Sequence, residues 1–350
     1  MSSSKHILFL TPGFPADVND FFCIPPLQEF LVKFRSVFPS SKISVISFQY
    51  PYHNKQYLWN DININPLGGK NKTYKKLFLW LKAIRQAKYI NQLDKVDVIH
   101  SLWLGECAMI GNILVKRFNC VHICTLMGQD VKKSNRYLRL QKNNRLKIVA
   151  LSKNQANQYL QITNRKADDI IHWGVDDQPE SIFERDIDLL AVGSLIPLKN
   201  YSLFVKLVDE ITKINPYIKC KLVGTGPESA ILKSMVREKG IEKNIEFTGL
   251  LSRTDVFELM KRSKILVHPS IFEGFGYVFA EALANGMNII SLNVGYAQSH
   301  PKWFIAKDER DFINIARDLL TSKLDFNSVN IFPLLETVYS YASLYDFSAY

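Results

Sequence analysis

Short apolar runs alternate with longer helical segments along most of this chain, and that alternation limits the folds open to it. The first half has such runs at residues 6–10, 43–48, 96–100, 122–126 and 147–151. The second half repeats the arrangement at residues 188–192, 221–223, 245–247, 265–268 and 288–292. Strands that alternate with helices build parallel sheets with helices on both faces. The sequence therefore predicts two doubly wound α/β domains.

The boundary between the two domains is predicted in a polar segment near the middle of the chain. Residues 176–181 contain a proline and four acidic or amide side chains between apolar segments. A length of 350 residues also agrees with two domains of about 150 to 180 residues each. We therefore expect an N-terminal domain at residues 1–178 and a C-terminal domain at residues 179–331.

The net charge is distributed unevenly over the two halves. Residues 1–180 carry 25 Lys and Arg against 13 Asp and Glu, a net charge of +12. Residues 181–350 carry 19 against 20, a net charge of −1. The excess predicts an anionic partner for the N-terminal domain only: a membrane surface, an acidic acceptor or nucleic acid.

Cysteine use and hydropathy favour a cytoplasmic protein. Five cysteines at irregular spacing do not describe a disulfide framework, and no apolar run approaches the roughly 18 residues that cross a bilayer. Cys120, His122 and Cys124 alternate along one predicted strand, where they would share a face. A metal site is one interpretation. We favour the other, a buried strand of small and apolar side chains, and expect no metal.

The residues that follow each strand matter most for function, because ligands of open parallel sheets bind beyond the carboxyl ends of the strands. After the run at residues 188–192 come Gly193 and Ser194, and Lys199 and Asn200 lie just before the next expected helix. An ammonium group there would lie beside phosphate oxygens that helix amides attract. The alternative is that Lys199 is a solvated surface lysine, which the same spacing also fits.

A glycine-containing loop follows the run at residues 221–223. Gly224 and Gly226 allow the backbone to turn tightly and approach a ligand, and Pro227 favours the first turn of a helix. Any tight turn uses the same residue types, so this loop alone does not identify a ligand.

Two glutamates eight residues apart flank a Gly-Phe-Gly turn after the run at residues 265–268. Glu273 lies in the loop, and a helix that begins near Tyr277 would carry Glu281 in its first turns. Amides at that helix start suit a diphosphate, and a carboxylate accepts two hydrogen bonds from the vicinal hydroxyls of a ribose or sugar ring. The pair therefore predicts a sugar-nucleotide ligand rather than two solvated surface acids. The turn itself consists of Gly274, Phe275 and Gly276.

Together these loops resemble those of glycosyltransferase family 4, a family of retaining enzymes with the GT-B fold. The resemblance rests on residues 193–200, 223–228 and 268–286, where Glu273 and Glu281 match the Glu-x7-Glu signature of the family. Flanking segments at residues 150–152 and 172–176 agree. The resemblance implies two Rossmann-like, doubly wound parallel-sheet domains that face each other across a cleft. It also implies a C-terminal helix near residues 332–350 that packs back on the N-terminal domain.

The resemblance further implies roles for the loop residues. Glu281 would hold the nucleotide ribose, Lys199 would face the diphosphate and Glu273 would orient the transferred sugar. The remaining donor contacts would be Gly193, Ser194, Asn200, Gly224, Gly226, Pro227, Gly274, Phe275, Gly276 and Tyr277. Members of the family use no metal or other cofactor, and the donor is expected to be a UDP- or GDP-sugar.

Three departures from the family pattern bear on activity. Ser194 stands where the family usually has an arginine, and residues 11–22 lack an expected pair of glycines. Met127 occupies the place of a histidine that lies near the reacting sugar in relatives. Asp130 is then the nearby polar candidate for a catalytic role, with a structural cap as the alternative.

Two basic segments of the N-terminal domain are candidate surfaces for an acceptor or a membrane. In a helix at residues 72–88, Phe78 and Leu79 would face outward among lysines, a mixture that an anionic bilayer attracts; a solvated helix covered by a loop is the alternative. The side chains expected to face the core are Leu77, Trp80, Leu81, Ile84 and Ala87. Residues 132–147 would lie beside a phosphorylated or lipid-linked acceptor, or form an ordinary solvated helix. Nucleic acid is not expected, because no binding motif accompanies the charge.

The sequence therefore predicts a retaining, metal-independent glycosyltransferase that is cytoplasmic and peripheral on the inner face of the cytoplasmic membrane. It would move a sugar from a nucleotide-sugar donor to a glycan or lipid-linked acceptor in cell-envelope or surface polysaccharide synthesis, such as lipopolysaccharide assembly. Two alternatives share the scaffold: a noncatalytic nucleotide-sugar or glycan-binding protein, and a GT-B sugar-nucleotide epimerase.

Overall fold

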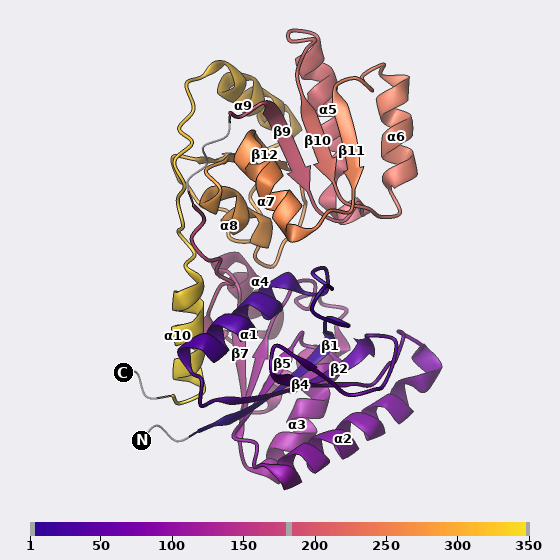
Figure 1. Ribbon diagram of the computed structural model, residues 1–350, viewed down its shortest axis with the longest axis vertical. Coiled ribbons are helices and arrows are strands. Elements are labelled where there is room, and N and C mark those ends of the chain that lie inside the picture. The colour runs from indigo at the N-terminus through magenta and orange to yellow at the C-terminus, as the bar shows by residue number, and fades with distance from the viewer. Residues whose placement is uncertain (1–3, 180–183, 348–350) are drawn as a thin grey trace. The chain divides into compact units, whose positions relative to one another are not determined.

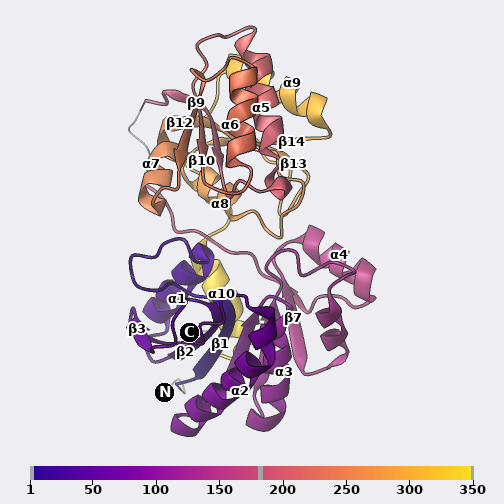
Figure 2. The same cartoon turned by 90° about the vertical axis from the view of Figure 1, so that its right-hand side faces the viewer.

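The computed structural model describes residues 4–179 and 184–347, which form two compact units (Figures 1 and 2). The N-terminal unit contains Met1–Gly174 together with Leu334–Tyr350, and the C-terminal unit contains Val175–Pro333. The chain thus enters the C-terminal unit after Gly174, not after residue 178, because the amide of Val175 donates to the carbonyl of Phe332 within that unit at 2.9 Å. Part of the predicted linker, residues 180–183, lies outside the described residues.

An eight-stranded sheet forms the centre of the N-terminal unit. The strands lie in the order β3-β4-β2-β1-β5-β6-β7-β8, and each is parallel to its neighbours except β3, which is antiparallel to β4. The strands are β1 (His6–Gly13), β2 (Lys42–Tyr50), β3 (Tyr57–Trp59), β4 (Ile62–Pro66), β5 (Val98–Leu102), β6 (Val121–Thr125), β7 (Leu146–Ala150) and β8 (Asp169–Ile170).

Helices cover both faces of this sheet (Figure 1). They are α1 (Pro25–Val37), α2 (Lys76–Leu93), α3 (Glu106–Phe118), α4 (Lys153–Thr163) and α10 (Leu334–Leu344). Successive side chains of a strand point to opposite faces, so a strand covered on both sides is apolar throughout. In β1, Leu8 and Leu10 belong to one core cluster with side chains of α2 and α3, whereas the ring of Phe9 lies 6.3 Å from that of Phe30 in α1.

The C-terminal helix α10 completes the core of the N-terminal unit. The rings of Tyr341 and Phe30 lie 5.2 Å apart. The hydroxyl of Tyr341 lies 2.8 Å from Oγ1 of Thr125, and the hydroxyl of Tyr345 lies 2.6 Å from Nδ1 of the buried His100. These contacts fix the last helix of the chain to strands and a helix that precede the C-terminal unit in sequence.

The C-terminal unit is built around a six-stranded parallel sheet in the order β11-β10-β9-β12-β13-β14. Its strands are β9 (Ile187–Val192), β10 (Cys220–Val223), β11 (Ile245–Gly249), β12 (Ser263–His268), β13 (Asn288–Leu292) and β14 (Trp303–Ala306). Side chains of α5, α6 and α9 form one core cluster with β9, while α7 and α8 pack on β9, β12 and β13. These helices are α5 (Tyr201–Thr212), α6 (Ser229–Glu238), α7 (Arg253–Arg262), α8 (Tyr277–Ala284) and α9 (Glu309–Thr321).

All ten predicted strands are present, and the structure adds β3, β4, β8 and β14. Three of the added strands lie at sheet edges, where a short segment with one partner needs little apolar surface. The fourth, β4, carries Asn63 and Asn65 and ends at Pro66, and these residue types are depleted in strands.

The helix predicted at residues 72–88 is present as the 3-10 turn η1 (Thr73–Lys75) followed by α2. Its buried face was predicted correctly only in part: Ala87 is buried, Trp80 and Ile84 pack against the core, and Phe78 is exposed, all as predicted. Leu77 and Leu81, expected in the core, are 68% and 59% exposed, whereas Leu79, expected outside, is 5% exposed. Apolar residues occupy both sides of this helix, so periodicity alone does not select the buried face. The side chains that α2 buries are Leu79, Ala83, Ala87 and Ile90.

The second basic segment, residues 132–147, is not an α-helix. It contains the 3-10 helix η2 (Arg136–Lys142), which buries no residue, and then enters β7. No helix in the described part of the chain has both the length and the hydropathy to span a bilayer.

Candidate functional site

The carboxyl ends of β9 and β12 lie side by side at the centre of the C-terminal sheet. The strand order runs outward in opposite directions from this pair, so the connections that follow β9 and β12 lead to helices on opposite faces. Such a switch point leaves a crevice at the carboxyl edge, where open α/β sheets bind ligands. The predicted loops at residues 193–200 and 269–276 both begin at this edge.

A lysine, a glutamate and a histidine meet at the switch point. Lys199, at the end of the 3-10 turn η3 (Pro197–Lys199), forms an ion pair with Oε1 of Glu273 from the loop after β12. The Nε2 atom of His268, the last residue of β12, lies 2.8 Å from the same oxygen. Lys199 and Glu273 were predicted from sequence and are brought together. His268 was missed as a site residue, although a histidine that ends a strand just before the glutamate loop was a usable signal.

The surroundings fix the charges of this cluster. Burial lowers the pKa of His268, against the opposing effect of the Glu273 charge. A neutral imidazole donates its Nε2 proton to Glu273, and its Nδ1 atom has no hydrogen-bond partner among the described residues. Burial alone would raise the pKa of Glu273, but the hydrogen bond from His268 and the charge of Lys199 outweigh it and hold that pKa well below its usual range. Glu273 is therefore a carboxylate.

Backbone hydrogen bonds join the loops around this cluster. The amide of Ile271 donates to the carbonyl of Leu198 at 3.0 Å, which brings the loop after β12 against the residue that precedes Lys199. The amide of Leu195 donates to the carbonyl of Thr225 at 2.9 Å, which joins the loop after β9 to the loop after β10. The arrangement of the loops therefore does not depend on the ion pair alone.

Gly224 and Gly226 have a packing role that the sequence left open. A Cβ atom on Gly224 would overlap the carbonyl oxygen of Gly193, and one on Gly226 would overlap that of Leu195. Gly224 also has a φ of 132°, which favours glycine. Pro227 lies in the turn before α6, not in the first turn of that helix as predicted.

Ser194 and Asn200 lie at the two ends of the loop after β9. Ser194 is exposed, and Asn200 is the left-handed residue, with φ of 51°, that leads into α5. Under this loop, the hydroxyl of the fully buried Tyr201 has no hydrogen-bond partner in the described residues, and a Cβ atom on Gly193 would meet it. The glycine at residue 193 therefore leaves room for that hydroxyl.

The Gly-Phe-Gly turn leads into α8, which begins at Tyr277 as predicted. Gly276 has a φ of 87°, in the left-handed region that favours glycine. The ring of Phe275 is 3% exposed and packs against the rings of Tyr296 and Phe332 at 5.8 and 5.1 Å. The side chain of Phe275 thus anchors the turn, and the Phe275 carbonyl accepts a hydrogen bond from the amide of Tyr296 at 2.9 Å.

Glu281 is paired with an arginine that sequence reasoning missed. Arg253, the first residue of α7, places an Nη2 atom 3.0 Å from Oε1 of Glu281. The guanidinium also lies over the rings of Phe257 and Tyr277, with its carbon 4.7 and 5.2 Å from their centroids. The signal was present, since Arg253 follows β11 and strand-end loops at this edge are the places to search for ligand contacts.

Asp130 lies at the carboxyl edge of the other sheet, in the loop after β6. Its side chain is 6% exposed, and its Oδ2 atom accepts hydrogen bonds from the amides of Leu104 and Met127 at 2.8 and 3.1 Å. Burial raises the pKa of Asp130 to about 6, while these amides act in the opposite direction. The carboxyl group braces the loops after β5 and β6, and its catalytic role stays a prediction.

The alternating Cys120, His122 and Cys124 belong to β6 and its approach. His122 and Cys124 are buried, and Nε2 of His122 lies 2.9 Å from Oγ of Ser101. Burial lowers the pKa of His122 to about 3. No cluster of His, Cys, Asp and Glu within residues 4–179 and 184–347 has the arrangement to hold a metal ion.

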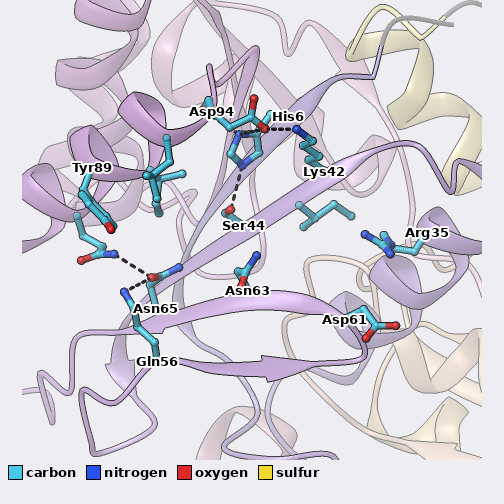
Figure 3. A pocket seen from close by; sticks show the side chains of 14 residues that line it. His6, Arg35, Lys42, Ser44, Gln56, Asp61, Asn63, Asn65, Tyr89 and Asp94 are labelled. Atoms are coloured by element: carbon cyan, nitrogen blue, oxygen red, sulfur yellow. Dashed lines mark hydrogen bonds and ion pairs between the residues drawn. The ribbon is translucent and has the colours of Figure 1, made fainter. Parts of the chain in front are cut away.

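A polar pocket of about 280 Å³ lies at the amino edge of the N-terminal sheet (Figure 3). His6 and Ser44 reach it from the starts of β1 and β2, and Lys42 pairs with Asp94 at 2.9 Å. Asn65 accepts hydrogen bonds from two glutamine side chains that also line the pocket. This edge is opposite to the ligand-binding edge of a parallel sheet, so the pocket has no part in the site described above.

Comparisons with known proteins agree with the geometry of the C-terminal unit. Residues 175–300 match the family model for glycosyl transferases group 1. An uncharacterized glycosyltransferase of Methanocaldococcus jannaschii is 28% identical over 232 residues, which are 64% of each chain. The gpi3 subunit of the phosphatidylinositol N-acetylglucosaminyltransferase of Schizosaccharomyces pombe is 27% identical over 40% of this chain and 31% of its own length. The chain therefore matches less than two thirds of either relative.

The whole chain is similar to a solved structure. The crystal structure of HepE from Anabaena in complex with UDP and glucose superposes with a TM-score of 0.74 and 17% sequence identity, over 97% of this chain and 99% of HepE. A sequence identity of 17% supports similarity of the fold only. The two parallel-sheet units therefore have the GT-B fold, and the C-terminal unit is similar to the group 1 glycosyl transferases.

Proposed function

We propose that this chain is a glycosyltransferase that moves a sugar from a nucleotide-sugar donor to a glycan or lipid-linked acceptor, in cell-envelope or surface polysaccharide synthesis. The observation that carries the proposal is the Lys199, Glu273 and His268 cluster at the switch point of the unit that matches the group 1 model. A buried carboxylate held by a cation and an imidazole at a ligand-binding edge is arranged to bind hydroxyl groups.

The donor would occupy the loops after β9 and β12. Lys199 and the amides of Gly274 to Gly276 would face the diphosphate, and the Glu281 carboxylate, oriented by Arg253, would accept hydrogen bonds from the ribose. A UDP- or GDP-sugar is the proposed donor, and UDP is the nucleotide in the HepE complex. No metal is needed in this scheme, because Lys199 supplies the positive charge beside the phosphates.

The chemistry follows from positioning and charge. Glu273 would hold the hydroxyls of the transferred sugar so that its anomeric carbon lies beside the acceptor hydroxyl. As the bond from that carbon to the diphosphate breaks, Lys199 would stabilise the negative charge on the departing diphosphate oxygen. This oxygen takes the proton of the acceptor hydroxyl, while the new glycosidic bond forms on the same face of the sugar. This front-side course would retain the anomeric configuration, as in family 4.

A noncatalytic role is the second candidate, and Met127 favours it. A thioether cannot donate or accept a proton as the histidine expected there would. A chain of this kind would bind a nucleotide-sugar or glycan without turnover, and an epimerase on the same scaffold would change the donor without an acceptor.

The first test is thermal stabilisation of the purified chain by a panel of UDP-, GDP-, ADP- and CMP-sugars, with Glu281→Ala beside it. We expect one nucleotide class to raise the melting temperature of the wild type and to lose that effect in the variant. Incubation of that donor with and without an acceptor extract then separates the candidates. Transfer of the sugar only when the acceptor extract is present supports the proposal. Conversion of the donor without the extract identifies an epimerase. A donor that stays unchanged under both conditions identifies a binding protein.

Peripheral attachment to the inner face of the cytoplasmic membrane is part of the proposal. The first turns of α2 and η1 expose four large apolar side chains among lysines: Tyr74 (78%), Leu77 (68%), Phe78 (71%) and Leu81 (59%). Such a face partitions into the interface of an anionic bilayer. The double variant Leu77→Ser with Phe78→Ser should reduce retention of the protein on phosphatidylglycerol vesicles at low salt. Equal retention of the variant and the wild type would contradict the proposal.

A further inference from the structure

A pocket of about 320 Å³ opens at the carboxyl edge of the N-terminal sheet. Its lining comes from five segments that meet there: the end of β1, the start of α2, the loop after β5, the first turn of α3, and η2. The lining residues are Pro12, Lys76, Trp103, Gly105, Glu106, Cys107 and Tyr137. It thus combines two aromatic rings, one carboxylate and one ammonium group at the edge where ligands of a parallel sheet bind.

The carboxylate of this pocket is held in one orientation. Glu106, in the first turn of α3, accepts a hydrogen bond from Nε2 of Gln49 on Oε1 at 2.5 Å and one from Nε1 of Trp80 on Oε2 at 2.8 Å. The Gln49 side chain is itself fixed, because its Oε1 accepts from the amide of Asn71 at 2.9 Å. Each carboxylate oxygen has further acceptor capacity, so Glu106 offers a fixed pair of acceptors to vicinal hydroxyl groups.

The larger ring of the pocket is held in a strained backbone position. Trp103 has a φ of 65°, a left-handed conformation that is unusual for a bulky residue. Its amide donates to the carbonyl of Thr125 at 3.0 Å, and its carbonyl accepts from the amide of Gly105 at 2.8 Å. The core does not require this indole, because Trp103 is only half-buried. Strain that packing does not explain is typical of residues that face ligands.

The ammonium group connects the pocket to the exposed face of α2. Lys76 is the first residue of α2 and directly precedes Leu77 and Phe78, which are exposed. It forms no ion pair with any residue that the structure describes. Lys72 and Lys75 are exposed in the same turn. A bilayer in contact with Leu77 and Phe78 would therefore place its phosphate groups beside Lys76 and the mouth of the pocket.

We infer that this pocket binds the sugar residue of a lipid phosphate whose hydrocarbon chain stays in the membrane under α2. The rings of Trp103 and Tyr137 pack on the apolar face of the sugar, Glu106 accepts hydrogen bonds from its hydroxyls, and Lys76 pairs with the phosphate. This inference rests on the proposed function and names its acceptor class. The pocket at the amino edge lacks this combination, because its lysine, Lys42, is already paired with Asp94 (Figure 3).

The test measures retention of the full chain on vesicles of phosphatidylcholine and phosphatidylglycerol by cosedimentation. The vesicles carry either polyprenyl phosphate or polyprenyl phosphate linked to glucose, galactose, mannose or N-acetylglucosamine. We expect at least one sugar head group to strengthen retention about tenfold over polyprenyl phosphate alone, as one charge-assisted hydrogen bond would.

Two variants separate the pocket from the membrane face. Trp103→Gly removes the ring and suits the left-handed backbone, and Glu106→Gln removes the charge at constant shape. Each should abolish the increase caused by the sugar while leaving retention on sugar-free vesicles unchanged. Leu77→Ser with Phe78→Ser should weaken retention on both. Tyr217→Gly, an exposed aromatic residue of the C-terminal unit, is the matched control and should change neither.

Three results would overturn the inference. They are the absence of any increase with all four head groups, an increase that survives Trp103→Gly and Glu106→Gln, and equally tight binding of the same sugar phosphates without a lipid. Thermal stabilisation by nucleotide-sugars, measured on the wild type and on the same variants, distinguishes a failure of this inference from a failure of the proposed function. If no nucleotide-sugar stabilises the wild type but the sugar-dependent retention is present, the proposed transferase function fails and the lipid-phosphate site stands.

Discussion

The carboxyl edges of the two sheets are organised by different chemistry. In the C-terminal unit, the charge pair of Lys199 with Glu273 joins the loops after β9 and β12, and that of Arg253 with Glu281 joins helices α7 and α8. In the N-terminal unit, the buried carboxyl of Asp130 binds backbone amides, and the open space is lined by Trp103 and Tyr137. Opposite charges join segments at the first edge, whereas a carboxyl group bonded to backbone amides and aromatic rings shape the second.

The difference teaches what each edge is prepared to bind. Ion pairs that are mostly shielded from water keep ionised groups in place for a charged ligand, at the cost of their desolvation. A pocket with aromatic walls and one fixed carboxylate suits a ligand with an apolar face and hydroxyl groups. The four predictions below test this division, from the largest expected effect to the smallest.

The largest effect is expected at the ion pair of the C-terminal edge. Glu273→Gln keeps the shape of the side chain but removes the charge that Lys199 and His268 hold in place. Transfer should fall by about 10²- to 10³-fold, the size of the loss when one oriented electrostatic contact to a reacting group is removed. Turnover of the donor identified by thermal shift is the measurement. Glu246→Gln, an exposed residue of the same unit, is the control, and equal rates in both variants would remove Glu273 from the mechanism.

At the N-terminal edge, the largest effect should appear in stability against pH. The pKa of Asp130 is raised from 3.8 to about 6, so the folded protein retains a proton that the unfolded chain releases between these values. The free energy of unfolding should therefore decrease as pH rises from about 4 to 6, by on the order of 3 kcal/mol for a shift of about two units.

Asp130→Asn provides the matched variant, since its amide oxygen accepts the same backbone hydrogen bonds without ionising. Urea unfolding between pH 4 and 7 should show a smaller decrease in the variant than in the wild type. Parallel curves for the two proteins would mean that Asp130 is not the source of the pH dependence.

A smaller effect is expected from the second charge pair. Arg253→Met leaves Glu281 without its guanidinium partner, so the carboxylate that we assign to the ribose is no longer oriented. Donor affinity should fall by about tenfold or somewhat more, as for a hydrogen bond to a charged group. Calorimetric titration with the donor measures the change. Arg237→Met, exposed at the end of α6, should leave the affinity unaltered, and an equal loss there would argue against a specific role of Arg253.

The smallest effect should come from adding a charge. Ser194 is exposed at the start of the loop after β9, where glycosyltransferase family 4, which these loops resemble, usually has an arginine. Ser194→Arg would place a second cation near the diphosphate and should strengthen donor binding a few-fold, about 1 kcal/mol, because solvent screens the new contact. The gain should diminish at high salt. A gain that persists at high salt would have a cause other than charge.

The parts of this fold and site that were predicted correctly depend on local patterns. Buried strands such as those at Leu189 and Leu266 are apolar on both faces, and the order of strands and helices requires parallel sheets. The loops that follow such strands collect at one edge, so Lys199 and Glu273 could be placed at a common site from their positions in the chain.

The parts that were missed depend on packing between distant segments. The buried face of α2 could not be chosen, because Leu77 and Leu79 have equal hydropathy and only the contact with the sheet distinguishes them. Arg253 and His268 entered the site through partners 28 and 5 residues away, at Glu281 and Glu273. Each residue lies next to a strand end, which marks it as a candidate, but that position alone does not specify these side-chain contacts.

The sequence by itself determined the two α/β units and the edges where ligands bind, because hydropathy period and strand order are local properties of the chain. Only the tertiary structure decided which groups meet at those edges, and with what charge. Lys199 and Glu273 become an ion pair, and Asp130 becomes a buried acceptor of amide hydrogens, because folding removes water and brings specific partners within hydrogen-bond distance. Desolvation and partner geometry exist only in the folded chain.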